Sequence, residues 1–142
     1  GVEVQMSATQ LATYIFILHQ SCCTHHGGLV KAGQHHPLSD KDVKRLGRTY
    51  HAICNLFRDT PITDERSYLE DVPNIRGYIA RIRTAIAHHI DDQDIRFYTP
   101  QDTSDKSRYY IAIDPTKITL RLSSGEIPFM DYPLWKTLAS KH

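Results

Sequence analysis

Apolar residues recur at helical spacing through the first two-thirds of the chain, which predicts three long helices. Serines that suit a helix N-cap precede the first two, at Ser7 and Ser39. Segment 33–37 is expected to end the first helix and Pro61 the second. The three apolar stripes are Leu11, Ile15, Leu18 and Cys22, then Val43, Leu46, Tyr50, Ile53 and Phe57, then Ile75, Ile79, Ile82, Ile86 and Ile90. Because their members lie three or four residues apart, each helix should bury one face.

The third helix, from about Asn74 to Asp91, has the clearest pattern. A short helical piece that opens at 63–65 and carries Tyr68 is expected to precede it and to stop before Pro73. Isoleucine is only a modest helix former, so packing against the other helices must stabilise the third helix.

After residue 92 the pattern changes to alternation of apolar and polar residues. Segments 109–113 and 118–122 alternate on either side of a turn at 114–116, which predicts a β-hairpin, with 95–99 as a third strand. Leu134 and Trp135 are expected in a last short helix. The predicted fold is therefore α+β and mostly α. It is an antiparallel helical bundle over 7–92, followed by a C-terminal β-hairpin or small sheet over 93–142 that packs on it.

Length and composition narrow the class of protein. A chain of 142 residues and 16.3 kDa suits a single domain over 1–142. The net charge of +1 argues against a broad basic surface for nucleic acid, although a small RNA site is compatible with it. Three cysteines, two of them adjacent, favour a reducing compartment. The longest apolar run, 11–18, is too short to span a bilayer, so we expect a cytoplasmic protein without membrane contact.

The third helix also carries the candidate chemistry. Its isoleucine stripe fixes the direction of the polar residues, and Arg83 falls at the edge of that stripe between Ala80 and Ala87. His88 falls roughly opposite the stripe, nearly in line with Arg81. A guanidinium can hold a phosphate through its planar fork, and an imidazole can transfer a proton near neutral pH.

The segment 82–88, Ile-Arg-Thr-Ala-Ile-Ala-His, resembles the motif of the HEPN superfamily, an arginine followed four to six residues later by a histidine in the last long helix. The resemblance implies a metal-independent endoribonuclease that works as a homodimer, with motif helices of both copies lining one cleft. Arg83 would then bind the scissile phosphate, and His88 would act as general acid or base on the 2′-hydroxyl of the RNA. Thr84, where the family usually has Asn, Asp or His, would orient Arg83. His89 would support His88.

Many relatives of this type are toxins or abortive-infection effectors in antiviral defence. The resemblance therefore implies RNA as substrate, a cognate antitoxin as partner, and no cofactor or metal. The competing interpretation is a non-catalytic interaction module, an inactive HEPN-like or other partner-binding domain whose Ala80 and Ala87 face binds another protein. In that case Arg83, His88 and their neighbours form an ordinary solvated helix face, with Arg83 paired to Asp91 or a neighbour.

The cysteines and histidines near the first helix end suggest a further alternative, a structural zinc site. Cys22, Cys23, His25 and His26 lie close together in the sequence, and the pair 35–36 follows. Zinc sites usually separate paired cysteines by two or more residues, whereas these are adjacent, and Cys22 continues an apolar stripe. A buried cysteine that acts as a small hydrophobic residue explains it more simply.

Overall fold

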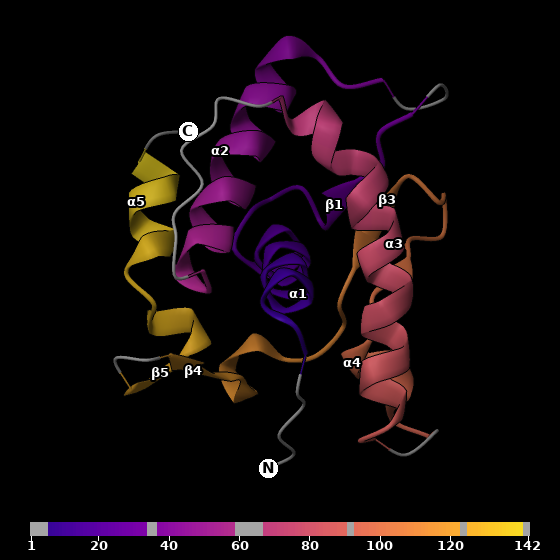
Figure 1. The fold of residues 1–142 in the computed structure, drawn as a ribbon, viewed down its shortest axis with the longest axis vertical. Coiled ribbons are helices and arrows are strands. Elements are labelled where there is room, and N and C mark those ends of the chain that lie inside the picture. Colours follow the sequence, from indigo (N-terminus) through magenta and orange to yellow (C-terminus); the bar gives the residue numbers. More distant parts are fainter. Residues whose placement is uncertain (1–5, 34–36, 59–66, 91–92, 123–124, 141–142) are drawn as a thin grey trace. The chain divides into compact units, whose positions relative to one another are not determined.

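The computed structural model describes residues 6–33, 37–58, 67–90, 93–122 and 125–140. The chain forms two compact units, residues 1–112 and 113–142. The first unit contains the long helices and a three-stranded sheet, and the second contains a β-hairpin and a short helix (Figure 1). This confirms the predicted fold class, α+β and mostly α. The single domain over 1–142 stays a prediction.

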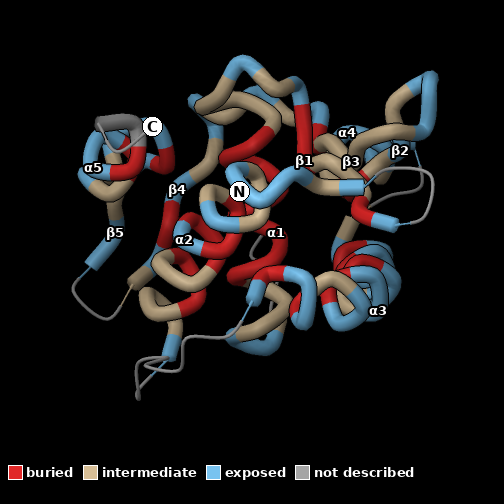
Figure 2. The backbone as a smooth tube through the Cα atoms, turned by 90° about the horizontal axis from the view of Figure 1, so that it is seen from above, coloured by how far each residue is buried: buried red, intermediate tan, exposed pale blue. Residues whose placement is uncertain are grey.

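Helix α1 (Ala8–Cys22) is the core of the first unit. It packs against α2 (Asp40–Leu56) and against α3 (Tyr68–Ala87), which lie on different sides of it (Figure 1). Residues 12 to 20 are all buried, as the continuous red tube of α1 shows in Figure 2. The predicted stripe was therefore too narrow, because Phe16 and Ile17 are fully buried, whereas Leu11 and Cys22 are only half-buried. A helix surrounded on all sides needs apolar residues all round.

The predicted N-caps of the first two helices are confirmed. The Oγ of Ser7 accepts a hydrogen bond from the backbone N–H of Gln10 at 3.3 Å, and that of Ser39 accepts one from Asp42 at 3.2 Å. Each bond satisfies a backbone donor that the first turn of a helix leaves without a partner. Helix α2 ends at Leu56, and Pro61, the expected stop, lies outside the described residues.

Helix α3 differs from its prediction at both ends. It begins after Ser67 as one continuous helix and contains Pro73, so the break expected at that proline was wrong. The missing N–H of Pro73 leaves the carbonyl of Leu69 without its helical donor. Leu69 is 53% exposed, so water can bind this carbonyl instead. The helix ends at Ala87, and the predicted opening at 63–65 and end at Asp91 lie outside the described residues.

A capping box begins α3. The Oγ of Ser67 accepts from the N–H of Leu69 at 3.2 Å, and Glu70 Oε2 accepts from the N–H of Ser67 at 3.0 Å. We expect Ser67→Ala to lower the free energy of unfolding by about 1 kcal/mol, because it removes a cap acceptor. Urea denaturation followed by circular dichroism measures this. Ser104→Ala, in an exposed loop, is the control and should change stability by less than about 0.5 kcal/mol.

The first unit also contains an antiparallel sheet in the order β1-β3-β2. Its strands are β1 (Leu29–Val30), β2 (Gln101–Asp102) and β3 (Arg108–Tyr110), with Leu29 opposite Tyr109 and Gln101 opposite Tyr110. Gly28 enters β1 with φ +143°, and a Cβ there would collide with the carbonyl of Tyr109. The turn therefore requires glycine so that the two backbones can approach.

Two strand predictions were wrong. Segment 95–99 contains helix α4 (Ile95–Tyr98), closed by the N–H of Thr99 donating to the carbonyl of Ile95 at 3.0 Å. Pro100 follows and keeps Thr99 extended. Segment 109–113 does not pair with 118–122, because β1 and β2 already occupy both edges of β3.

The second unit builds its own hairpin from β4 (Thr119–Leu122) and β5 (Gly125–Pro128). A 3-10 helix, η1 (Pro115–Lys117), stands where the turn was predicted, and η2 (Phe129–Asp131) follows β5. The predicted last helix is α5 (Leu134–Ser140). Trp135 donates its indole N–H to the carbonyl of Phe129 at 2.6 Å, and their ring centroids are 5.1 Å apart, with both side chains buried. None of the helices in the described ranges has the length and apolar character that crossing a membrane would require.

Candidate functional site

The buried isoleucines of α3 decide where its polar residues point. Ile75, Ile79, Ile82 and Ile86 are each at most 3% exposed, so they face the core of the first unit. The opposite side of the helix is exposed, as its blue sector shows in Figure 2. Arg83, Thr84, His88 and His89 all belong to the exposed set. The predicted site residues therefore lie at the surface, near the C-terminal end of α3.

Arg83 is anchored although it is exposed. Its Nε donates a hydrogen bond to the carbonyl of Pro100 at 3.0 Å, seventeen residues further along the chain. No other hydrogen bond of the Arg83 guanidinium is found within the described ranges. The bond restricts the rotation of the side chain, and the Nη groups are the donors that could bind a phosphate.

The charge of Arg83 interacts with the carboxylate of Asp102. Lys31 Nζ binds Asp102 Oδ1 at 2.8 Å, and this contact is the main cause that holds the pKa of Asp102 below its ordinary value. Arg83 lowers that pKa further. Asp102 is therefore ionised at neutral pH, and a phosphate on Arg83 would approach a negative charge that Lys31 already offsets in part.

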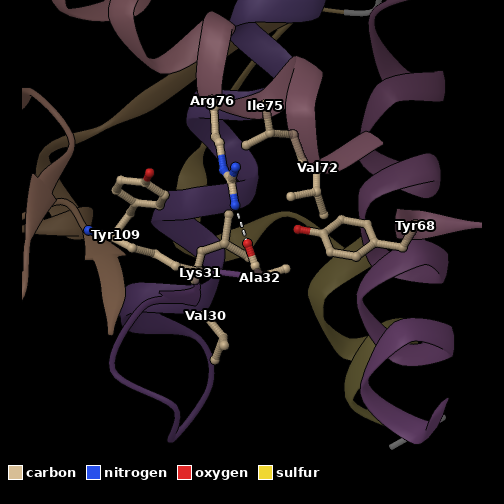
Figure 3. Close-up of a pocket in the computed structure, with 9 residues that line it drawn as sticks. Val30, Lys31, Ala32, Tyr68, Val72, Ile75, Arg76 and Tyr109 are labelled. Carbon is tan, nitrogen blue, oxygen red and sulfur yellow. Dashed lines mark hydrogen bonds between the residues drawn. The ribbon is translucent and has the colours of Figure 1, made fainter. Parts of the chain in front are cut away.

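Arg76 makes a backbone contact comparable to that of Arg83. It lies seven residues before Arg83, on the same side of α3, and its Nη2 donates to the carbonyl of Ala32 (Figure 3). Both arginines thus tie α3 to a neighbouring backbone. The contact of Arg83 with Pro100 is therefore compatible with a structural role as well as with a catalytic one, and Arg76 offers a matched control.

Thr84 and the two histidines follow Arg83. The hydroxyl of Thr84 donates to the carbonyl of Ala80 at 3.2 Å, within its own helix, so the structure shows no contact by which it would orient Arg83. His88 caps the C-terminal end of α3, and the N–H of His89 donates to the carbonyl of Ile86 at 3.0 Å. Both imidazoles are exposed and accessible to a large ligand.

The helix geometry separates Arg83 from His88 within one chain. Five residues at about 100° each place the two roughly 140° apart around α3, whereas Arg81 and His88 differ by only about 20°. A single copy therefore presents Arg83 on one side and His88 on another.

A hydrogen-bonded histidine–aspartate pair that the sequence analysis missed connects α2 and α3. His51 Nε2 and Asp71 Oδ2 are 2.8 Å apart, and Asp71 is 3% exposed. Asp71 lies four residues before Ile75, so it continues the isoleucine stripe of α3. A carboxylate on a buried stripe was the signal that could have been noticed. This signal was missed because the break expected at Pro73 placed Asp71 in a different helix from Ile75.

The cysteine and histidine cluster does not assemble a zinc site in the described parts of the chain. Cys22 Sγ and Cys23 Sγ are 3.5 Å apart, and their hydrogen bond raises the pKa of Cys22 and lowers that of Cys23. The rings of His25 and His26 lie 4.6 Å apart between centroids, tilted by 35°. No group of three or more metal-binding side chains is found among the described residues, and the pair 35–36 lies outside them.

Comparison with known proteins identifies no relative. The sequence matches no family model, and no curated protein or solved structure shows significant similarity to it.

Proposed function

We propose that this protein is a metal-independent endoribonuclease of HEPN type. The observation that carries the proposal is the placement of Arg83, which is exposed at the surface of α3 while its Nε is bound to the carbonyl of Pro100. The motif resemblance of segment 82–88 supplies the reaction class, and the exposed His88 at the helix end supplies a group that can transfer a proton.

The proposed reaction uses the RNA itself as nucleophile. The 2′-oxygen attacks the adjacent phosphorus, its proton passes to an imidazole, and the bond from phosphorus to the 5′-oxygen breaks as that oxygen takes up a proton. The products are a 2′,3′-cyclic phosphate and a free 5′-hydroxyl. Arg83 would stabilise the charge that develops on the phosphate oxygens, and His88 would transfer the proton. This route requires no protein nucleophile and no metal.

The geometry of α3 supports a homodimer as part of this proposal. Because Arg83 and His88 face different sides of the helix, two copies related by a twofold axis would let one chain supply the arginine and the other the histidine. Ala80 and Ala87 flank Arg83 and are exposed, so a second helix could approach closely there. We further propose that the protein acts in the cytoplasm as a toxin or phage-defence effector, held inactive by a cognate antitoxin.

A second candidate function is a non-catalytic interaction module. The parallel between Arg83 and Arg76 favours it, since both bind backbone carbonyls and could serve only to hold the fold together. In this case the exposed Ala80 and Ala87 face would bind another protein, and the chain would cleave no RNA.

The experiment compares Arg83→Ala and His88→Ala with the wild type in a gel assay on single-stranded RNA in EDTA. We expect each variant to cleave at least about 10²-fold more slowly, because each removes a group that stabilises charge or transfers a proton in the transition state. Arg76→Ala loses an equivalent backbone contact, and His25→Ala loses an exposed imidazole far from α3 in sequence. Both controls should cleave at the wild-type rate.

The controls separate the two candidate functions. If Arg83→Ala and Arg76→Ala lose stability and activity together, Arg83 is structural and the catalytic assignment is wrong. A wild-type protein that is monomeric by analytical ultracentrifugation and cleaves no RNA supports the interaction module.

A further inference from the structure

Cys22 and Cys23 form a pair of neighbouring thiols at the end of α1. Cys22 is the last residue of the helix, and Cys23 is its C-cap, with the N–H of Cys23 donating to the carbonyl of His19 at 2.9 Å. Both side chains are half-buried thiols, and their Sγ atoms are 3.5 Å apart. The helix end therefore holds two sulfurs side by side, each partly accessible to solvent.

A direct disulfide bond does not suit this backbone. The peptide bond between the two cysteines is trans, and a trans peptide separates neighbouring Cα atoms by about 3.8 Å. Disulfides usually join residues whose Cα atoms are about 4.4–6.8 Å apart, and shorter separations strain the bond. The two sulfurs, 3.5 Å apart, are better placed to bind one atom between them than to bond to each other.

The distance between the sulfurs indicates which bridging atom fits. With the sulfurs 3.5 Å apart, two bonds of about 2.3 Å, the length of a zinc–thiolate bond, meet at an angle of about 100°. A linear two-coordinate ion such as copper(I) needs sulfurs separated by twice the bond length, which is more than the observed distance. The angle is instead typical of a pyramidal atom that carries a lone pair, such as trivalent arsenic.

The number of ligands also favours trivalent arsenic over zinc. Zinc sites in proteins use at least three protein ligands. Within the described ranges, no group of three or more histidine, cysteine, aspartate or glutamate side chains is placed to hold a metal. Trivalent arsenic takes three ligands, and the third can be a hydroxide or an organic group that arrives with it. Two protein sulfurs therefore complete an arsenic site and leave a zinc site incomplete.

The two thiols differ in their readiness to react. Cys22 has one S–H proton, which it can donate to the carbonyl of Leu18 at 3.0 Å or to Cys23 Sγ. Donation to Cys23 lowers the pKa of the Cys23 thiol, and the thiolate is the form that attacks an electrophile. Cys23 is therefore expected to bond first, and Cys22 then gives up its hydrogen bond and closes the bridge.

We propose that Cys22 and Cys23 form a binding site for trivalent arsenic, which bridges the two sulfurs at the end of α1. Each sulfur forms one bond to arsenic and displaces one hydroxyl group of arsenous acid, which leaves as water with the thiol proton. Arsenic stays trivalent, so the step consumes no oxidant or reductant. The site uses none of the residues assigned to the ribonuclease reaction and does not depend on that proposal.

Phenylarsine oxide is the probe, because its arsenic carries one phenyl group and leaves two positions for sulfur. It is titrated into the reduced full chain with excess mercaptoethanol, a monothiol competitor, and native mass spectrometry counts the adducts. We expect one adduct per chain, formed with loss of one water. Cys22→Ser and Cys23→Ser keep a single sulfur of the pair, and each should bind at least about 10²-fold more weakly because the second bond is intramolecular.

Cys54→Ala is the matched control. It removes the third cysteine, which is buried in α2, and leaves the pair intact, so it should bind the arsenical as the wild type does. Far-ultraviolet circular dichroism checks that each variant is folded. An adduct that Cys22→Ser and Cys23→Ser retain at full strength, or one that Cys54→Ala loses, would overturn the assignment of the site to the pair.

Comparison with the unfolded chain tests the geometry, because residues adjacent in sequence also offer two sulfurs without a fold. We expect the folded protein to bind at least about tenfold more tightly than the same chain in concentrated urea, since the helix end holds the sulfurs at bridging distance. Equal or weaker binding by the folded protein would overturn the proposal. Zinc that binds the pair as tightly as the arsenical would reveal further ligands and overturn the choice of arsenic.

Discussion

An RNA that carries 2′-deoxyribose at the cleaved position is expected to resist this protein completely. In the proposed reaction the 2′-oxygen is the attacking atom, so its removal eliminates the nucleophile and not only a binding contact. The cleaved position is first mapped on all-ribose RNA by gel electrophoresis, and mass spectrometry of the product should find a 2′,3′-cyclic phosphate. The modified RNA should then remain intact for as long as the assay can follow it.

The same substitution placed a few nucleotides away is the control for weakened binding. That RNA should be cut at nearly the normal rate, since it keeps the reacting 2′-hydroxyl. Cleavage of the RNA with deoxyribose at the mapped position, or a linear phosphate formed directly, would show that water attacks the phosphorus. The reaction proposed for Arg83 and His88 would then be wrong.

Phe16→Ala is expected to lower the free energy of unfolding by about 3–5 kcal/mol, the usual cost of emptying a buried aromatic site. Phe16 is 0% exposed, and its ring lies 5.0 Å from that of Tyr50 and 6.1 Å from that of Tyr68, measured between centroids. The side chain thus connects α1 with both α2 and α3. Such a loss is a large part of the roughly 5–15 kcal/mol that stabilises a typical domain.

Urea denaturation, monitored by far-ultraviolet circular dichroism, measures this change in the free energy of unfolding. The signal reports on the helices and does not depend on tryptophan. Phe16→Leu keeps most of the buried volume and should cost less than about 1.5 kcal/mol. If Phe16→Ala were as stable as Phe16→Leu, α1 would not be the core of the helical unit in solution.

Much of the helical part could be predicted from the sequence because its signals are local. Ser7 and Ser39 begin helices as expected, and the isoleucines from Ile75 to Ile86 are buried together. Caps and apolar spacing act within a few residues, so they can be recognised without the rest of the fold. The prediction of a break at Pro73 was wrong. The cost of a proline inside a helix depends on whether solvent reaches the carbonyl of Leu69, and only the folded environment decides this.

The strands could not be predicted as well, because strand pairing is not local. The alternation at 109–110 is real, but Tyr109 pairs with Leu29, eighty residues earlier, and with Asp102. The alternation at 95–99 was too short to exclude a helix, and α4 forms there. Short apolar–polar runs support either structure, and the available partners decide between them.

In the candidate site, too, some features follow from the sequence and others only from the tertiary structure. The exposure of Arg83 and His88 follows from the isoleucine stripe, so the amino-acid sequence alone determined that these side chains lie outside the core and near one helix end. Only the tertiary structure brought Arg83 to Pro100 and His51 to Asp71. Helix periodicity depends on neighbours within one or two turns, whereas contacts between distant segments depend on how complete helices pack against one another.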